Sequence, residues 1–365
     1  MTGTPSTAWL RAQRLRSQLL DGTEASPLEV VRTLGAVQAQ NALAGRWAIG
    51  LRAAGATDGD IERLYADGAI VRSWTMRGTL HIVAAEDLGW MLSLTAARQR
   101  AGAAREAVVR GITEADFERA SELIAQEVDE SSPLTRAEAL AALQRSGVDV
   151  GNERGYRFIR DAALRGLVAW GPSRGKQQQL VAVPGPVAAA SEADRDEALA
   201  RFLLRYATGH APVTVSDFAW WSGLTLTDAR RAVAVAGRRI ESLGEEGWLV
   251  PAEGESLVQG SPSGGTSALA PVQATPAWDE YVLGYRERSP VLDPAFAGRV
   301  SPTGNGVFLP TIVSSGRVVG TWRHSVQRSR LIVQTDPFTS LTASERRGFD
   351  ASVDRMARFL GVSRA

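Results

Sequence analysis

The spacing of apolar residues along the chain predicts helices separated by short extended segments. The clearest example starts at Thr135, which we expect to cap a helix over residues 136–145 that ends at Gly147. Asn152 is then expected to cap a second helix running to Leu167, because apolar residues recur there at steps of three and four. One face of this second helix should pack, and the other should face solvent.

A hairpin is predicted directly after these two helices. Residues 168–170 and 180–183 have the composition of strands, and the loop between them contains Lys176. Two helices followed by a basic hairpin is the order of a winged helix-turn-helix, whose second helix enters the major groove of DNA. In that interpretation the second helix partly exposes a set of arginines: Arg154, Arg157, Arg160 and Arg165.

The same order of elements recurs on both sides of this unit. Downstream, helices are expected at 198–206, after Thr214 and after Thr225 or Thr227, followed by a hairpin at 240–249. Upstream, helical segments at 27–39, 46–54 and 60–66 precede strands at 70–75 and 78–83. The repeat is one of architecture, because the three segments share no strong sequence similarity.

The C-terminal part alternates strand-like segments and ends in a helix. A Gly-, Pro- and Ser-rich linker at 251–277 precedes strands at 281–284, 306–313, 317–322 and 330–334, and Thr342 is expected to cap the last helix. We therefore predict an α+β fold, mainly α, with three tandem winged helix-turn-helix units, a small β-rich C-terminal module and a terminal helix. The corresponding segments are 1–120, 121–190, 191–262 and 263–365.

Composition excludes several kinds of chemistry. The chain has no cysteine, which excludes thiol catalysis, disulfides and iron–sulfur clusters, and its 3 histidines lie far apart, so no metal site is expected. Neither a GxxxxGK[ST] loop nor a GxSxG motif is present, and we expect no cofactor. No apolar run approaches the roughly 18 residues of a membrane span, so we expect no membrane partner and a cytoplasmic, nucleoid-associated protein.

Net charge at first argues against a nucleic-acid partner. The 41 Lys+Arg residues nearly balance the 40 Asp+Glu residues, and Lys176 is the single lysine. Arginines nevertheless recur on the three predicted recognition helices and on two hairpins, which favours a basic DNA-binding surface. For any one helix, a solvated face balanced by neighbouring acids explains them equally well, and a GC-rich genome would itself favour arginine codons.

A cluster of neutral amides ends the first predicted helix, at Gln38, Gln40 and Asn41. In a helix, residues two apart diverge by about 200°. Both glutamines therefore face one site only where the helix unwinds or the chain is extended. The simpler interpretation is an exposed polar helix end.

A second segment, at 71–83, interleaves apolar residues with Arg72, Arg77 and His81. This pattern predicts a hairpin. Its arginines and histidine are candidate DNA contacts, and the alternative is an ordinary β-hairpin with a core tryptophan and a hydrogen-bonded histidine.

Three sequence blocks together resemble the AlkZ/YcaQ family of bacterial DNA glycosylases. They are VQAQ at 37–40, VRSWTMRGTLHIV at 71–83 with AAEDLGW after it, and the late block WDEYVLGYRERS…FLPTIVSSGRVVGTWRH that ends at His324. The resemblance covers essentially the whole chain, and the combination is far more specific than VQAQ alone. It implies tandem winged helices around a concave DNA-binding surface, with a β-rich C-terminal part.

The resemblance also implies a function and a set of site residues. Family members excise N7-alkylated purines, including bases in interstrand crosslinks, and a role in self-resistance to a DNA-alkylating antibiotic follows from it. The essential glutamine–apolar–glutamine motif maps onto Gln38, Ala39 and Gln40, and a DNA-probing hairpin maps onto the turn near Gln327. The expected DNA-binding residues are Asn41, Arg72, Arg77, His81, Arg157, Arg160, Lys176, Arg323, His324, Arg328 and Arg330.

Neutral amides suit such a substrate because alkylation at N7 already makes the base positively charged. The base then leaves as a neutral molecule, and the enzyme has only to place water and stabilise developing charge. A lyase reaction needs a Schiff-base amine, for which Lys176 is the only lysine. We therefore expect a monofunctional glycosylase, hydrolysis without strand cleavage, and double-stranded DNA with alkylated bases as the partner of a monomer.

Two alternatives stay open at this point. Asp279 and Glu280 are the carboxylates that could act as a base instead, although we favour structural pairing with Arg286 or Arg288. A winged-helix transcription regulator without catalysis would have a similar composition, but regulators usually dimerise on a palindrome. Three tryptophans could stack on a base or on deoxyribose: Trp47, Trp74 and Trp278.

Overall fold

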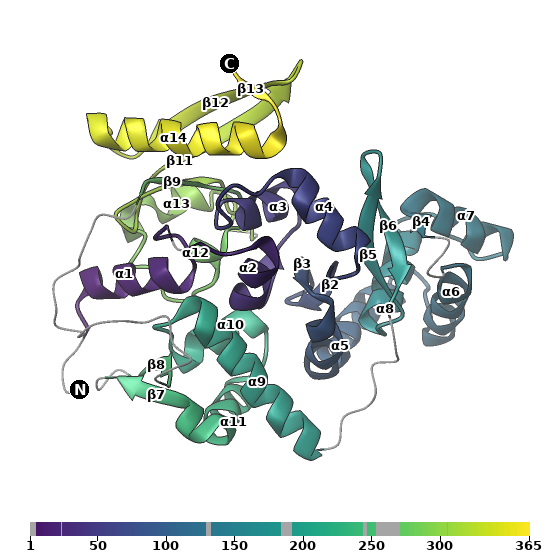
Figure 1. Cartoon of the computed structure of the whole chain (residues 1–365). Helices are drawn as coiled ribbons and strands as arrows, with labels where there is room; N and C mark the ends of the chain where they lie inside the picture. Colours follow the sequence, from purple (N-terminus) through teal and green to yellow (C-terminus); the bar gives the residue numbers. More distant parts are fainter. Residues whose placement is uncertain are drawn as a thin grey trace. The chain divides into compact units, whose positions relative to one another are not determined.

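The computed structural model describes residues 5–22, 24–128, 133–183, 192–243, 247–252, 271–304 and 306–365. The chain groups into two compact units, one formed by Met1–Ile61 with Leu199–Ala365 and the other by Glu62–Ala198 (Figure 1). Both units mix helices and strands, as the predicted class requires. The division into four consecutive segments stays a prediction.

The first unit contains helices from both the N-terminal and the C-terminal parts of the chain. They are α1 (Thr7–Ser17), α2 (Pro27–Leu34), α3 (Ala42–Gly50), α10 (Val215–Ser222), α11 (Leu226–Ala236) and α14 (Ala343–Leu360). The chain passes between the units within α4 (Asp58–Ala66) and α9 (Glu192–His210), and α9 is longer than the predicted 198–206. Within the described ranges, no helix combines the length and the hydropathy needed to cross a membrane.

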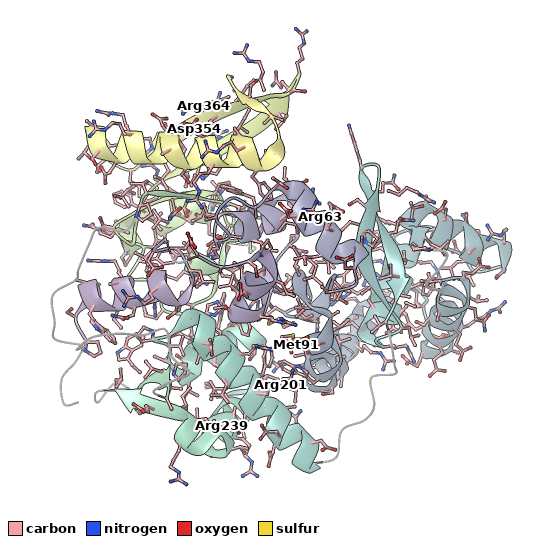
Figure 2. The ribbon with its side chains drawn as sticks, in the orientation of Figure 1. Arg63, Met91, Arg201, Arg239, Asp354 and Arg364 are labelled. Carbon is pink, nitrogen blue, oxygen red and sulfur yellow. The ribbon has the colours of Figure 1, made fainter. Side chains whose placement is uncertain are left out.

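A five-stranded sheet forms the C-terminal part of the first unit. Its order is β13 (Ser363–Arg364), β12 (Arg330–Pro337), β11 (Arg317–Gln327), β10 (Thr311–Ser314) and β9 (Gln273–Thr275), antiparallel except for β12 with β13. Helix α14 packs on it, with the Phe349 ring 5.8 Å from that of Trp322. Arg364 on β13 pairs with Asp354 of this helix at 3.3 Å, as Figure 2 lets the reader follow. The strands predicted at 306–313, 317–322 and 330–334 thus correspond to β10, β11 and β12, and the terminal helix is capped by Thr342 as expected. Strand β9 lies within the segment 251–277 that was expected to be a linker.

One expected strand is a helix. Residues 281–284 were predicted to be extended, but Glu280–Leu283 forms the short helix α12. The side chain of Asp279 accepts a hydrogen bond from the backbone N–H of Tyr281 and so caps this helix. The apolar run of the segment reflects burial rather than a strand.

The predicted helices after Thr214 and Thr225 are confirmed. Each threonine accepts a hydrogen bond from an aspartate N–H three residues later and so caps α10 or α11. A hairpin of β7 (Ile240–Leu243) and β8 (Trp248–Pro251) follows. Of its predicted turn at 245–247, residues 245 and 246 lie outside the described residues. A short 3-10 helix, η1 (Gly237–Arg239), follows α11 and contains Arg238 and Arg239.

The second unit contains an antiparallel sheet with helices around it. The strands run in the order β3 (Thr79–Ala84), β2 (Ile70–Met76), β5 (Val168–Arg174), β6 (Gln177–Ala182) and β4 (Leu134–Thr135). The helices are α5 (Ala85–Val108), α6 (Glu114–Glu127), α7 (Arg136–Arg145) and α8 (Arg154–Leu164). Sequence reasoning placed α7, α8 and both hairpins but did not foresee α5 or α6.

The turn between α7 and α8 differs in detail from the prediction. Thr135 caps α7 reciprocally with Glu138, as expected. Helix α8 starts at Arg154, and Asn152 does not cap it, because Asn152 and Glu153 both have left-handed backbones, with φ of 48° and 63°. The chain thus reverses within two residues before α8 begins.

Candidate active site

The amide cluster lies where α2 gives way to an extended segment. Helix α2 ends at Leu34, five residues before the predicted end, because Gly35 adopts a φ of 72°. Strand β1 (Val37–Gln38) follows, and Asn41 then caps α3 by accepting a 3.0 Å hydrogen bond from the N–H of Ala44. The condition that sequence reasoning set for a shared site, a helix that unwinds, is therefore met.

Burial distinguishes the members of this cluster. Gln38 is 5% exposed and Ala39 is fully buried, whereas Gln40 and Asn41 are exposed. The segment thus leads from a buried amide to an exposed one within three residues.

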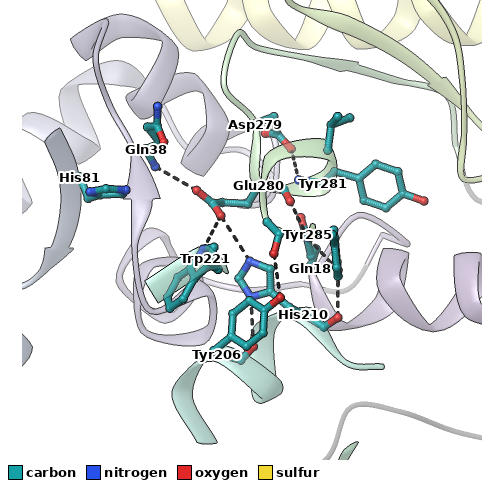
Figure 3. Close-up of polar contacts among 12 residues, drawn as sticks. Gln18, Gln38, His81, Tyr206, His210, Trp221, Asp279, Glu280, Tyr281 and Tyr285 are labelled. Carbon is teal, nitrogen blue, oxygen red and sulfur yellow. Dashed lines mark hydrogen bonds and ion pairs between the residues drawn. The ribbon is translucent and has the colours of Figure 1, made fainter. Parts of the chain in front are cut away.

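Glu280, the first residue of α12, contacts the backbone of this segment. Its Oε1 accepts a 3.2 Å hydrogen bond from the N–H of Gln38, and its Oε2 accepts one of 2.8 Å from the indole Nε1 of Trp221 (Figure 3). The same Oε2 lies 3.4 Å from Nε2 of His210. Glu280 is 1% exposed.

Asp279 is held by a different partner. Arg52 donates two hydrogen bonds of 2.8 Å to its carboxylate and also donates to the side chain and backbone of Gln18. The Gln18 amide in turn donates to the backbone oxygen of Glu280 and to the hydroxyl of Tyr285, each at 3.1 Å. One polar network therefore fixes α12 against α1, α3 and β1.

The interpretation of these two carboxylates as structural is supported, but the expected partners were wrong. Asp279 pairs with Arg52, and Arg288 lies over the rings of Trp220 and Phe308, at 4.7 and 5.0 Å from their centroids. The cap that begins α12 turns both acids into the core, toward residues distant in sequence.

Three buried tyrosines surround this network. The hydroxyl of Tyr206 donates to the backbone oxygen of Gly284 at 2.7 Å, that of Tyr281 to Gly316 at 2.8 Å, and that of Tyr285 to His210 at 2.9 Å. Burial raises the pKa of all three phenols above the usual value. They therefore remain neutral donors across the ordinary pH range.

Four of the predicted DNA contacts lie together on the hairpin of β11 and β12. Arg328 and Ser329 form its two-residue turn with φ of 48° and 59°, and Arg323, Arg328 and Arg330 are exposed. His324 is half-buried with its ring 5.1 Å from that of Trp322, and burial lowers the pKa of this histidine. The sequence-predicted basic turn is thus a long antiparallel hairpin.

The predicted hairpin at 71–83 is also present, but it does not expose all its polar residues. Arg77 and Gly78 form its turn, with φ of 53° and 72°. His81 is fully buried, with Nδ1 3.0 Å from the hydroxyl of Thr75 and Nε2 3.3 Å from the Arg77 guanidinium. His81 is thus covered by other residues in this structure, and its assignment as a DNA contact stays a prediction. Arg72 is half-buried with a hydrogen bond to Gln178.

The arginines that α8 was expected to expose in part are paired with acids. Arg157, whose side chain is 13% exposed, pairs with Glu106 of α5 at 2.9 Å, and Arg165 pairs with Asp161 and Glu114. The unforeseen helices α5 and α6 supply two of these acids. Lys176, at the turn between β5 and β6, is exposed.

Two further groups of candidates can be placed. Trp47 and Trp74 are each 1% exposed, so they belong to the core, whereas Trp278 is half-buried. Among the described residues, no three or more His, Cys, Asp or Glu side chains lie together so as to hold a metal ion.

Known proteins resemble the chain along its whole length. A family model described as DNA glycosylase AlkZ-like matches residues 31–359. An interstrand DNA cross-link repair glycosylase of Streptomyces sahachiroi is 27% identical over 368 residues, which is 97% of this chain and 96% of that protein. The solved structure of Streptomyces sahachiroi DNA glycosylase AlkZ matches with a TM-score of 0.78 and 25% identity, covering 100% of this chain and 98% of that one.

These matches bear on the two functional alternatives. They confirm the resemblance inferred from the three sequence blocks, and they give no support to a transcription regulator without catalysis. The structural match also confirms the mixed α and β fold. The chain belongs to the AlkZ-like family of DNA glycosylases.

Proposed function

We propose that the protein is a monofunctional glycosylase that hydrolyses the N-glycosidic bond of N7-alkylguanine-type lesions in double-stranded DNA. Interstrand crosslinks are included, as the name of its Streptomyces relative suggests, and self-resistance to a DNA-alkylating antibiotic is the corresponding role. The observation that carries the proposal is the Gln38–Ala39–Gln40 motif, which starts in strand β1 just after α2 has ended, in a chain of this family.

The protein has mainly to position the attacking water and the sugar. The bond between C1′ and N9 breaks, and its electron pair neutralises the cationic alkylated base. A water oxygen bonds to C1′ and releases its proton to solvent. A glutamine oxygen accepts a hydrogen bond from this water and faces the cationic sugar, while its NH₂ donates to the DNA. Weakly basic amides suffice because the lesion itself is labile.

The nearby carboxylates do not supply a general base. Both oxygens of Asp279 accept hydrogen bonds from Arg52, and both oxygens of Glu280 contact Gln38, Trp221 or His210. Asp279 is 4% exposed and Glu280 is 1% exposed. Water cannot reach either group in a position to be deprotonated, which leaves the amides of the motif.

DNA contacts are assigned from exposure and charge. The β11–β12 hairpin, with Arg323, His324, Arg328 and Arg330, is proposed to probe the duplex, and its Val326 is 46% exposed at the tip. Four further residues are proposed contacts: Asn41, Arg72, Arg77 and Lys176. The Nε2 atom of His81 lies 3.3 Å from the Arg77 guanidinium and positions it. Arg157 and Arg160 join them, because the Glu106 side chain that pairs with Arg157 is 62% exposed and phosphate can replace it as the partner.

The finer architecture belongs to the same proposal. Helices α7 and α8 with β5–β6, and α10 and α11 with β7–β8, have the order of winged helices, and a third is proposed around β2–β3. A monomer that carries three such units needs no palindromic partner.

The test is a duplex that contains one N7-methylguanine, incubated with the purified protein. We expect free N7-methylguanine and an abasic site, with an intact strand until alkali is added. Strand cleavage that persists in Lys176→Ala with a blocked N-terminus would contradict water as the nucleophile. Sequence-selective binding of undamaged DNA without base release would instead favour a regulator.

A further inference from the structure

We propose that Glu280 is a positioning residue for the reaction, acting through the backbone of Gln38. The inference rests on the proposed role of Gln38 and adds a residue that lies 242 positions away in sequence. Glu280 does not touch DNA in this assignment. It fixes the peptide from which the Gln38 side chain projects.

The contact is made to the backbone of the motif itself. Strand β1 contains only two residues, and the backbone N–H of Gln38 donates to Oε1 of Glu280 at 3.2 Å. A hydrogen bond to an ionised acceptor is about twice as strong as one between neutral groups. The bond therefore sets the direction of the Gln38 peptide.

Glu280 is itself held rigidly. The indole of Trp221 donates to Oε2 at 2.8 Å, and the amide of Gln18 donates to its backbone oxygen at 3.1 Å. A Cβ added at Gly284 would lie 2.6 Å from Cδ2 of His210, so α12 packs closely on α9. A side chain anchored at both ends transmits its position to the group it binds.

His210 contacts the same carboxylate. Its Nδ1 lies 3.0 Å from the backbone oxygen of Tyr206, and its Nε2 lies 3.4 Å from Oε2 of Glu280. His210 is 0% exposed and Glu280 is 1% exposed. Oε2 is therefore held between two buried ring nitrogens, those of His210 and Trp221.

The expected size of the effect follows from geometry. A catalytic group misplaced by about 1 Å costs up to about a hundredfold in rate. Glu280→Gln keeps the shape but offers one acceptor and one NH₂ group, so it cannot accept from both Gln38 and Trp221. One of these two donors then faces another donor, and the motif shifts.

The experiment compares Glu280→Gln with Asp217→Asn. Asp217 is also a fully buried carboxylate of the same unit, but its Oδ1 accepts from the backbone N–H groups of Arg286 and Glu287. Single-turnover excision of N7-methylguanine is measured with both proteins folded, together with Kd for lesion DNA. Glu280→Gln should lose about ten- to a hundredfold in rate with Kd within about twofold, and Asp217→Asn should stay within about threefold of wild type.

A second readout separates positioning from general damage. In ¹⁵N-glutamine-labelled protein, the amide proton of Gln38 should resonate at higher field and exchange faster in Glu280→Gln, but not in Asp217→Asn. If Glu280→Gln does not fold, Trp221→Phe, which removes one anchor of Oε2, should show the same changes at smaller size.

A folded Glu280→Gln with wild-type rate, or an unchanged Gln38 amide, would overturn the proposal, and so would equal losses in both variants. Failure of the wild type to release base would overturn the proposed function instead, and the amide comparison would still decide whether Glu280 fixes Gln38.

Discussion

Arg52 and Asp279 form a fully buried ion pair in which two guanidinium nitrogens each donate a 2.8 Å hydrogen bond to one carboxylate oxygen. The pair joins the residues just after α3 to the cap of α12. It thereby connects the helix that follows the glutamine motif with the helix that carries Glu280.

Asp279→Asn should destabilise the protein strongly, because it leaves the Arg52 guanidinium buried without a counter-charge. Breaking one side of a buried pair costs about 3–5 kcal/mol in the free energy of unfolding. Urea denaturation measures this, with Asp21→Asn as control, since the Arg16–Asp21 pair is partly exposed and should matter by less than about 1 kcal/mol. Equal effects in the two variants would contradict the structural role of Asp279.

Gly35→Ala should destabilise the junction between α2 and the motif. The residue has a φ of 72°, and an added Cβ would lie 3.3 Å from Cγ of Arg205. Gly55→Ala is a matched control, with a φ of 77° and no atom within 4 Å of the added Cβ. Both variants should lose about 1 kcal/mol from the backbone. A larger loss for Gly35→Ala in thermal unfolding would report the crowding, and identical losses would argue against it.

Alkaline pH should unfold the protein by ionising its buried tyrosines. Burial raises the pKa of Tyr206, Tyr281 and Tyr285, whereas an unfolded tyrosine titrates near about 10. The folded state keeps these protons while the unfolded state loses them, so stability is unaffected below about pH 10 and falls as pH rises above it. Tyrosinate absorbance beyond that of the exposed Tyr156 should appear together with unfolding. If all tyrosines ionised while the protein stayed folded, the burial of these phenols would be contradicted.

The hairpin arginines should contribute to DNA affinity through phosphate contacts. Arg328→Ala and Arg330→Ala should each weaken binding alike across sequences, and each should lower the magnitude of the salt slope of log Kd by about one. Arg347→Ala on α14 is a control of equal charge change, because Arg347 is exposed and has no proposed DNA role. If the salt slope of log Kd changed as much in Arg347→Ala, the assignment of the hairpin to the DNA interface would be contradicted.

Local chemistry made much of the fold predictable. Four threonines cap helices as expected: Thr135, Thr214, Thr225 and Thr342. Each is followed three residues later by an acidic residue in the first turn of the helix, which is the sequence pattern of a helix start. Turns at residues 77–78 and 328–329 form where short polar or glycine pairs separate strand-like runs.

Other features depend on contacts that no local pattern encodes. The basic face of α8 looked free because α5 and α6 were not foreseen, and their acids now pair with its arginines. At the site, the sequence indicated only that the helix must unwind for both glutamines to face one site. It did not indicate that the helix ends at Leu34. The hydrogen bond from the Gln38 backbone to Glu280 could not be predicted, because Glu280 reaches Gln38 only after α12 forms and packs.

Single-turnover release of N7-methylguanine from a duplex, measured beside the Kd for the same duplex, tests most directly whether Gln38 and Gln40 carry the reaction. Gln38→Ala and Gln40→Ala should each lower the rate by about a hundredfold or more, as loss of one preorganised transition-state contact does, with Kd within about twofold of wild type. Wild-type excision rates in both folded variants would contradict the assignment of catalysis to these two amides.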